Sequence, residues 1–529
     1  MTDFYLGYPW DPKTGRVKPR PVTVDLTTRP HTSMTAPTGS FKGVSIEIPN
    51  LLIGLRDCSV FNIDSSGQNA AVCAEARRQM GHRFWPINPK HVHVRHYPDL
   101  ASVGHNPMDD LKVNNPARFL MRATAIAEAF DTTQRAEGNS RFFDTGARML
   151  GTGLIMYVKL RDGDKANLGT VRDLLTEEEI TDDDGVPIKG LRYTAARAVA
   201  TGHRATANLM ARFTHDSRSN RDIISTLQNA TRVLDDDDIR ADLAKSGTDY
   251  GTLKDVPTTV MLIVPAGTEQ QFLAPFVRLH VNAALDSIYA RGDGTGLRVV
   301  FMLSEAAQIG RLDPLVAAIG QGRKYGISLA PIVWQDLNQA REVFGDNNAK
   351  TLLANSGCLF AFNPGNDSDT SEFLSKLAGE HLVPGLNASD DPQHPDRGNI
   401  SPQRERLWSP EEIRSLPERH ALVWRAGEAR PQTLYCPPYW DIEACRRVAR
   451  IDPFHPQGMP PPARARGAQR ALRLMLAGAL GLMAAAFALS LQHQTAPVGD
   501  ALHAEAAVTD HRPAPLPTRH AHRHGALRY

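Results

Sequence analysis

Short apolar runs of strand length lie on both sides of a long helical stretch, and this order of segments leaves few folds open to the chain. The runs are "SIEIPNLL" (45–52), "CSVFNID" (58–64), "TTVMLIVP" (258–265), "RVVFML" (298–303) and "SLAPIVW" (328–334). Residues 69–81, "NAAVCAEARRQMG", have a helical pattern and stand between the strand-like "FNIDSSGQ" and "HRFWPINP". Strands that alternate with helices are typical of a parallel sheet, so we predict an α/β fold.

Between residues 116 and 250 the apolar residues recur with helical spacing, and strand patterns nearly vanish. The helical segments are "ARFLMRATAIAEAF", "SRFFDTGARMLGTGLIMYVKL", "TAARAVATGHRATANLMARF" and "NRDIISTLQNATRVL". We therefore predict an all-α domain inserted into the α/β domain. The predicted parts of the folded chain are then 1–115, 116–250 and 251–452.

An uncharged apolar stretch at 474–491 follows a linker rich in Pro and Arg at 453–473. At roughly 1.5 Å per residue, a helix of this length just spans the apolar core of a bilayer. Arginines precede it without an intervening acid, so the positive-inside bias predicts one C-terminal transmembrane helix with the N-terminal part in the cytoplasm. The composition also fits a buried, Ala-rich core helix. The tail at 492–529, rich in His and Pro, is expected to be disordered.

The composition argues against several classes of protein. The formal net charge is only +2 at pH 7, so attraction to nucleic acid has to come from a local basic patch. The 5 cysteines are too few and too scattered for a disulfide framework or a CxxC metal site, and they suit a reducing cytosol as small buried residues. The first residues, "MTDFYLGYPWDPKTGR", have no apolar core of the kind that a signal peptide needs.

The segment "APTGSFKG" (36–43) is similar to the phosphate-binding Walker A loop, G-x-x-x-x-G-K-[ST]. Such loops bind phosphate because backbone N–H groups and a helix N-terminus point at the anion, while a lysine supplies positive charge. The residues assigned to nucleotide binding are Thr38, Gly39, Ser40, Lys42 and Gly43. Phe41 replaces the usual glycine before the lysine. Taken alone the match is weak, so a chance loop and the remains of a nucleotide site both stay open.

A second segment, "RVVFMLSEAAQIG", adds weight to the loop. An apolar strand that ends in Asp-Glu is the Walker B arrangement, in which the aspartate supports Mg²⁺ and the glutamate polarises the attacking water. Ser304 occupies the aspartate position, where it could support the metal only weakly through a water molecule, and Glu305 keeps the second position. The next strand ends at "VWQD", which predicts that Gln335 lies near the γ-phosphate as a sensor.

These motifs and a series of further blocks resemble the TraG-like type IV coupling proteins, the membrane-anchored P-loop ATPases of conjugation and type IV secretion. The blocks run through most of residues 30–440 and include "APTGSFKGVSIEIPNLL", "FNIDSSGQN", "GHRFWPINP", "FFDTGARMLGTGLIMYV", "SEAAQIGRLDPLVAAIGQGRKYGI" and "LLANSGCLFAFNPGNDSDTSEFLSKLAG". So many blocks in the same order make the resemblance specific.

The resemblance implies a RecA-like domain that binds ATP and Mg²⁺, interrupted by the all-α domain, in a homo-oligomer that is often a hexameric ring. It also implies a protein of the bacterial inner membrane whose bulk is cytoplasmic. Such a protein brings relaxase–DNA complexes or effector proteins to the channel components of a type IV secretion system. The sequence does not distinguish DNA from protein as the cargo.

The chain departs from the family pattern at three points. Phe41 stands where family loops have glycine, and it would be strained if the backbone there needs a positive φ. Ser304 removes a full negative charge from a site where Mg²⁺ neutralises phosphates. Family members usually carry N-terminal membrane helices, whereas here the loop begins at residue 36 and the apolar span is C-terminal. Gly43 is no departure, because many members have glycine there.

Two hypotheses about the chemistry follow. In the first the chain is a working motor: Lys42 holds the β- and γ-phosphates, Glu305 orients water and Gln335 senses the γ-phosphate. An arginine such as Arg323 could then reach a neighbouring subunit's site, although a surface arginine is the simpler interpretation. In the second the chain is a catalytically weak pseudo-ATPase that serves as a membrane-tethered receptor or scaffold. The replacements at 41 and 304 favour the second hypothesis, because losing one catalytic carboxylate commonly costs orders of magnitude in rate.

Three other patterns have simpler interpretations than a functional site. The acidic run at 235–238 is expected to start a helix, since carboxylates favour the positive end of the helix dipole. "HVHVRH" (91–96) alternates like a strand, which would place His91, His93 and Arg95 on one face, but no further ligand pattern supports a metal site. "RHAHRH" (519–524) is expected to be part of a solvated tail.

Overall fold

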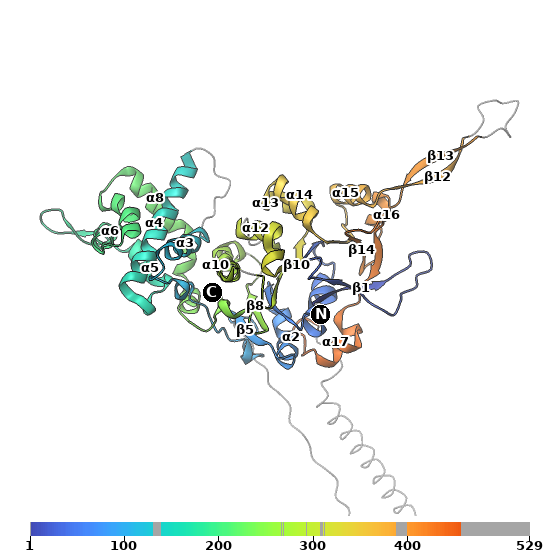
Figure 1. Ribbon diagram of the computed structural model, residues 1–529, viewed down its shortest axis with the longest axis horizontal. Helices are drawn as coiled ribbons and strands as arrows, with labels where there is room; N and C mark the ends of the chain where they lie inside the picture. The colour runs from blue at the N-terminus through green and yellow to red at the C-terminus, as the bar shows by residue number, and fades with distance from the viewer. Residues whose placement is uncertain are drawn as a thin grey trace, which may run out of the picture. The chain divides into compact units, whose positions relative to one another are not determined.

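An eleven-stranded sheet forms the core of the part of the chain that the structure describes (Figure 1). The computed structural model describes residues 2–130, 139–265, 267, 269–292, 294–306, 310, 313–387 and 399–455. The order of the strands is β2-β1-β15-β14-β11-β3-β10-β9-β4-β8-β5. From β11 to β5 neighbouring strands run parallel, whereas β14, β15, β1 and β2 extend the sheet in antiparallel fashion.

The strands of this sheet are β1 (Asp3–Pro9), β2 (Val22–Asp25), β3 (His31–Thr35), β4 (Cys58–Asp64), β5 (Arg83–Ile87), β8 (Thr258–Ile263), β9 (Arg298–Leu303), β10 (Ile327–Trp334), β11 (Cys358–Phe362), β14 (His420–Arg425) and β15 (Gln432–Tyr435). Two hairpins stand apart from it, β6–β7 (Ile180–Thr181 and Pro187–Lys189) and β12–β13 (Glu380–Asn387 and Asn399–Arg406).

The helices are α1 (Ile48–Ile53), α2 (Gln68–Gln79), α3 (Pro116–Glu128), α4 (Asn139–Asp162), α5 (Leu168–Thr176), α6 (Leu191–Ala200), α7 (Arg204–Met210), α8 (Arg218–Ala230), α9 (Asp237–Leu243), α10 (Glu269–Arg291), α12 (Asp313–Gln321), α13 (Leu337–Phe344), α14 (Asp346–Asn355), α15 (Ser368–Ala378), α16 (Pro410–Arg414) and α17 (Glu443–Val448). A π-helix, η1 (Gly43–Glu47), precedes α1 directly. Short 3₁₀ turns are η2 (Pro98–Leu100), η3 (Pro107–Asp110), η4 (Gly163–Lys165), η5 (Ala211–Thr214), η6 (Arg232–Asp235), η7 (Tyr250–Thr252), η8 (Gly322–Tyr325) and η9 (Tyr439–Asp441).

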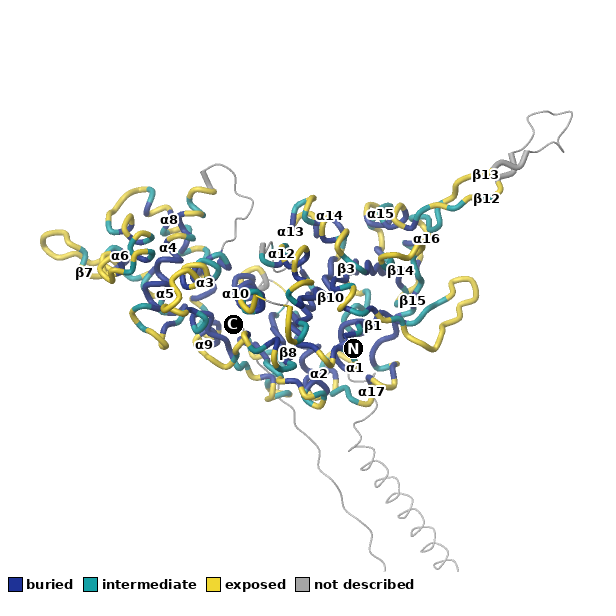
Figure 2. Tube along the Cα trace, viewed as in Figure 1, coloured by how far each residue is buried: buried dark blue, intermediate teal, exposed yellow. Residues whose placement is uncertain are grey.

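Both faces of the sheet are covered, as β9 shows. Phe301 and Leu303 belong to an apolar core that includes residues of α10 and α12, whereas Val300 and Met302 belong to a second core that includes residues of α1 and α2. Figure 2 shows β8 and β10 buried along their length. A parallel strand covered on both faces has a nearly continuous apolar sequence. For this reason the runs at 58–64, 258–265, 298–303 and 328–334 were recognisable, and the predicted strands there are confirmed.

The prediction of a strand at 45–52 is wrong, because "SIEIPNLL" lies in η1 and α1. A short apolar run does not distinguish a buried strand from a buried helix by its pattern alone. Pro49 is compatible with the helix, since it occupies the first turn of α1, where the missing N–H has no partner to lose.

The long helices predicted between residues 116 and 250 are present as α3 to α9. The β6–β7 hairpin interrupts them, which corrects the expectation that this stretch is entirely helical. Helix α4 contacts α3, α7 and α8, and its buried residues include Leu150 and Leu154. The domain division at 115 and 250 stays a prediction.

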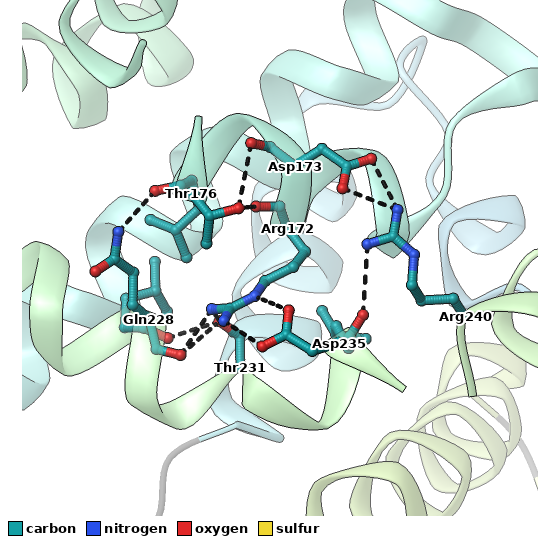
Figure 3. A network of polar contacts seen from close by, with 10 residues as sticks. Arg172, Asp173, Thr176, Gln228, Thr231, Asp235 and Arg240 are labelled. Atoms are coloured by element: carbon teal, nitrogen blue, oxygen red, sulfur yellow. Dashed lines mark hydrogen bonds and ion pairs between the residues drawn. The ribbon is translucent and has the colours of Figure 1, made fainter. Parts of the chain in front are cut away.

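A polar network joins three of these helical segments (Figure 3). The guanidinium of Arg172, in α5, donates to both carboxylate oxygens of Asp235, to the backbone carbonyl of Gln228 and to Oγ1 of Thr231, at 2.6–2.9 Å. The side chain of Arg172 is only 8% exposed. These four hydrogen bonds, all donated by the charged guanidinium of Arg172, fix α5 to the end of α8 and to η6.

The acidic run at 235–238 begins α9, as predicted. The carboxylate of Asp236 accepts hydrogen bonds from the backbone N–H groups of Asp238 and Ile239, and it pairs with Lys90. The five cysteines are all buried and free, which fits their expected use as small apolar residues.

The predicted strand at 91–96 is wrong. His91 and His93 have φ values of 54° and 58°, in the left-handed region, so the segment forms a series of turns instead. His93 Nε2 lies 3.0 Å from the backbone carbonyl of Ser66. Among the described residues, no group of three or more His, Cys, Asp or Glu side chains is arranged to hold a metal ion.

Three predictions concern residues outside the described part of the chain, namely the transmembrane helix at 474–491, the disordered tail at 492–529 and the solvated "RHAHRH" run within that tail. Within the described ranges, no helix is both long and apolar enough to cross a membrane.

Candidate functional site

The predicted site residues follow strands that lie next to one another in the sheet. β10 lies between β3 and β9, with Trp334 paired to Thr35 and Ile332 paired to Leu303. Because these strands are parallel, the segments that follow them, at 36–43, 304–305 and 335, emerge at the same edge. Ligands of open α/β sheets bind at this carboxyl edge.

The loop at 36–43 is open to solvent on its outer side. Thr38 and Gly39 are exposed, and a Cβ atom added at Gly39 or Gly43 would meet no heavy atom within 4 Å. Lys42 stands directly before η1, and its Nζ lies 3.5 Å from the carbonyl of Ala36. The loop therefore offers room for a phosphate group beside a lysine and the start of a helix.

Phe41 has a φ of 61°, so the strain that the sequence predicted at this position is present. Its ring packs against the sheet core formed with α1 and α2, and the guanidinium of Arg419 lies 4.8 Å from the ring centroid. A cation over an aromatic face contributes about 0.5–1 kcal/mol at exposed sites, which offsets part of the cost of the left-handed backbone.

Ser304 is buried at the end of β9, and its Oγ donates a 2.7 Å hydrogen bond to Oε2 of Glu47. Asn69 Nδ2 donates to the same oxygen at 2.9 Å. Glu47 Oε1 is buried without a hydrogen-bond partner among the described residues, as are Ser45 Oγ and Asn62 Nδ2. A buried carboxylate thus lies at the position where the Walker B pattern expects a negative charge.

The electrostatics of Glu47 reflect its depth. Burial raises the pKa of its carboxyl group, while the hydrogen bonds from Ser304 and Asn69 and the positive charge of Lys42 act in the opposite direction. Sequence reasoning missed Glu47. The available signal was an acid inside the apolar run "VSIEIPNLL", on a segment where every neighbour from Val44 to Leu52 is buried.

The remaining predicted residues are less closely tied to the loop. Glu305 is half-buried directly after Ser304, and Gln335 is exposed, with its backbone N–H donating to Oε1 of Gln339 at 2.9 Å. No hydrogen bond or ion pair joins Glu305 or Gln335 to Lys42 in the described ranges. Arg323 lies in η8, before β10, which places it at the amino edge of the sheet and away from its own chain's loop.

Comparison with known proteins gives concordant results. The sequence profile of the family described as "Type IV secretory system Conjugative DNA transfer" matches residues 10–440. The chain is 26% identical over 357 residues to the conjugal transfer protein TraG of Rhizobium radiobacter, covering 67% of this chain and 53% of TraG. It is 23% identical over 432 residues to Protein VirD4 of Agrobacterium fabrum (strain C58 / ATCC 33970), covering 79% of this chain and 60% of VirD4.

Among solved structures, the plasmid coupling protein TrwB in complex with ADP and Mg²⁺ has the same mixed α/β fold. Its TM-score is 0.57 at 18% sequence identity, with 82% of this chain and 95% of that chain covered. At this identity the likeness concerns the fold alone. The chain spans only between half and three fifths of the length of TraG and VirD4. The match over residues 10–440 nevertheless covers most of the sequence, and the chain belongs to the type IV secretory system conjugative DNA transfer family.

Proposed function

We propose that this protein is a type IV coupling protein that binds ATP with Mg²⁺ at the loop 36–43 and recruits substrates to an inner-membrane secretion channel. The substrates would be relaxase–DNA complexes or effector proteins. The observation that carries the proposal is the position of Lys42, at the start of a helix and at the same sheet edge as Ser304 and Glu305. Membership of the conjugative DNA transfer family supports the role in secretion.

Each residue of the site has a proposed role. The residues that would hold the phosphates are Thr38, Gly39, Ser40, Lys42 and Gly43. Glu305 would orient the attacking water, and Gln335 would sense the γ-phosphate. Mg²⁺ would neutralise phosphate charge. Oε1 of Glu47, beside Ser304, is buried and has no hydrogen-bond partner among the described residues, and a bound cation would satisfy this oxygen. The TrwB complex with ADP and Mg²⁺ supports both cofactors by analogy of fold.

Two alternatives remain for the catalytic activity: the protein is either an ATP-driven motor or a catalytically weak receptor or scaffold. The strained Phe41 and the uncharged Ser304 favour the weak form, because both change the surroundings of the phosphates. The presence of a buried carboxylate next to Ser304 favours a motor that retains activity. We also propose that the protein forms a homo-oligomer, a hexamer, on the resemblance to coupling proteins alone.

The membrane anchor is the third part of the proposal. The uncharged stretch at 474–491, preceded by arginines, would hold the protein in the bacterial inner membrane with its bulk in the cytoplasm. Washing membranes with alkaline carbonate tests this part. An anchored protein stays in the membrane pellet, and release into the wash would refute the anchor.

Nucleotide binding by the full-length protein in detergent tests the proposed site directly. We expect Lys42→Ala to weaken binding of a fluorescent ATP analogue by about tenfold or more, since a hydrogen bond to a charged group contributes about 1.5–3 kcal/mol. Lys13→Ala, which removes an exposed lysine far along the chain from the loop, is the matched control and should leave the dissociation constant unchanged. Equal binding by wild type and Lys42→Ala would rule out the site.

Phosphate release under the same conditions separates the two forms. A motor loses turnover in Lys42→Ala and in Glu305→Gln. A scaffold binds nucleotide without turnover, and Phe41→Gly combined with Ser304→Asp should then raise turnover above background.

A further inference from the structure

Position 304 has a hydroxyl where the Walker B pattern has a carboxylate, yet an acidic side chain lies beside it. Glu47, on η1 directly after the loop, brings its carboxylate to 2.7 Å from Ser304 Oγ. The two residues are 257 positions apart in the sequence and meet only in the folded chain, through this hydrogen bond. The folded site therefore contains the pair Ser304–Glu47 in place of one aspartate.

The environment of Glu47 is unusual for a purely structural acid. The residue is 2% exposed, and no lysine or arginine forms an ion pair with it in the described part of the chain. Only Oε2 has donors, from Ser304 and Asn69, while Oε1 has none. Leaving a buried acceptor unsatisfied costs about 1–3 kcal/mol, and more for a charged group.

Nearby buried acids show how a structural carboxylate is satisfied here. Asp64, at the end of β4, is equally buried, but it accepts hydrogen bonds from the backbone N–H groups of Ala70 and Ser66 and so fixes the start of α2. The hydrogen bonds of Asp64 explain its burial by a structural role at the start of α2. In Glu47, Oε2 accepts hydrogen bonds from two side chains, whereas Oε1 accepts none among the described residues. Oε1 is therefore available to bind a ligand.

The neighbourhood of Glu47 contains further unpartnered polar atoms. Ser45 Oγ, two residues earlier in η1, and Asn62 Nδ2, in β4, are buried without partners among the described residues. Asn62 belongs to the same group, since its Oδ1 accepts from Asn69 Nδ2. A π-helix such as η1 is rare and occurs frequently at functional sites, where the wider turn changes the direction of a side chain.

We propose that Glu47 supplies, from the helix after the loop, the carboxylate that position 304 lacks, and that Glu47 and Ser304 together hold the Mg²⁺ of a bound nucleotide. The inference rests on the proposed nucleotide site at 36–43 and names residues for its metal. Carboxylate and hydroxyl oxygens are ligands that Mg²⁺ accepts, directly or through its water molecules. Glu47 is thus a metal-binding residue, and Ser304 is a second ligand that also positions Glu47 by hydrogen bonding to Oε2.

The test measures nucleotide affinity with and without metal, which does not depend on turnover. The dissociation constant of a fluorescent ADP analogue is determined for the full-length protein in Mg²⁺ and in EDTA. We expect Mg²⁺ to lower the dissociation constant of the wild type. In Glu47→Gln, this effect of Mg²⁺ should be about 10–100-fold smaller. The dissociation constant in EDTA should be the same for both proteins. In the double variant Glu47→Gln with Ser304→Asp, the gain should return, because a carboxylate is restored at the neighbouring position.

Asp64→Asn is the matched control, since it neutralises an equally buried acid on the next strand. It should lower the melting temperature and leave the ratio of the two dissociation constants unchanged. Melting curves of Glu47→Gln confirm that the variant is folded, and Ser304→Ala provides a second variant, with a smaller loss of the Mg²⁺ effect.

The outcomes separate this inference from the proposed function. If wild type binds nucleotide and folded Glu47→Gln keeps the full Mg²⁺ effect, the role of Glu47 is refuted while the nucleotide site stands. The same conclusion follows if Mg²⁺ has no effect on wild type. If wild type binds no nucleotide in either condition, the proposed site fails and the inference falls with it.

Discussion

Phe41 combines an aromatic side chain with a backbone conformation that favours glycine. At a φ of 61° an L-residue costs roughly 1–2 kcal/mol relative to glycine, because Cβ approaches the following carbonyl oxygen. The contact with Arg419 and the adjoining core offsets this cost. We therefore expect Phe41→Gly to be more stable than Phe41→Ala by about 1 kcal/mol in urea unfolding. A more stable alanine variant, the usual order outside such positions, would contradict the strain.

The buried carboxyl group of Glu47 leads to a second prediction at the scale of one residue, which concerns how stability depends on pH. Burial raises its folded-state pKa above the unfolded value, so its favourable contribution exists at low pH and is lost as the pH rises through the folded-state pKa. Glu47→Gln should then stabilise the protein without nucleotide at pH 8, by on the order of 1 kcal/mol. The difference from wild type should shrink towards pH 4.5. Thermal unfolding at both pH values measures it, and destabilisation at pH 8 would contradict the account.

The residues of the proposed site differed in how far the sequence revealed them. Lys42 was recognisable because phosphate loops have a local pattern of spacing around one lysine. Glu47 was not recognisable, because its significance depends on a hydrogen bond to Ser304, 257 positions away. Only the fold of the chain brings that pair together.

At the scale of helices, two arginine–aspartate pairs near each other allow a direct comparison (Figure 3). Arg172 is 8% exposed and also satisfies a carbonyl and a hydroxyl, whereas Arg240 is 29% exposed and pairs with Asp173 at the surface. We expect Arg172→Ala to lower the free energy of unfolding by about 2–3 kcal/mol, since it removes a largely buried side chain together with the donors to the buried Thr231 hydroxyl and the partly buried Gln228 carbonyl.

The matched change Arg240→Ala should cost at most about 1 kcal/mol, as is usual for exposed ion pairs. Arg172→Lys should recover less than half of the loss, because an ammonium cannot reproduce the forked geometry. Urea unfolding of the three variants measures these values. Equal costs for Arg172→Ala and Arg240→Ala would show that burial of the network contributes nothing.

Helices were predictable where apolar residues recurred with helical spacing over a long stretch, and parallel strands were predictable where the apolar run was nearly continuous. The error at 45–52 arose because an eight-residue apolar run fits both a buried strand and a buried helix. The error at 91–96 arose because alternation was read without knowledge of the left-handed backbone at His91 and His93. In both segments tertiary contacts, which the local sequence does not contain, decided the conformation.

For the whole molecule, buried histidines predict acid sensitivity. Burial lowers the pKa of His31, His82 and His105 to about 4, below the unfolded value of 6.5. Their stabilising effect is therefore complete above pH 6.5 and is lost as the pH falls towards 4, by up to about 1.4 kcal/mol per pH unit for each histidine.

Acids with raised pKa values act in the opposite sense, such as Asp110, whose pKa burial raises to about 6. A single variant isolates one group from this sum. In His105→Gln the loss of unfolding free energy between pH 7 and pH 5 should be smaller than in wild type. His96→Gln, a change at an exposed histidine, should leave the loss unchanged. An identical pH dependence in His105→Gln and wild type would contradict the burial argument.

The architecture of the whole molecule was predictable only in part. The predicted strands at 58–64, 258–265, 298–303 and 328–334 are present in the parallel part of the sheet, but the antiparallel extension through β14, β15, β1 and β2 was not anticipated. It joins the first residues of the chain to residues beyond 430, and such pairing over long separations leaves no trace in local periodicity.

The central claim is that Lys42 and Glu305 face one triphosphate pocket at the carboxyl edge of the sheet. A structure of the full-length protein with a non-hydrolysable ATP analogue and Mg²⁺ tests it most directly. The account predicts phosphates held by the loop at 36–43, with Lys42 Nζ at the β- and γ-phosphates and Glu305 facing the γ-phosphate. A nucleotide bound elsewhere, or one whose phosphates contact only one of these two side chains, would contradict it.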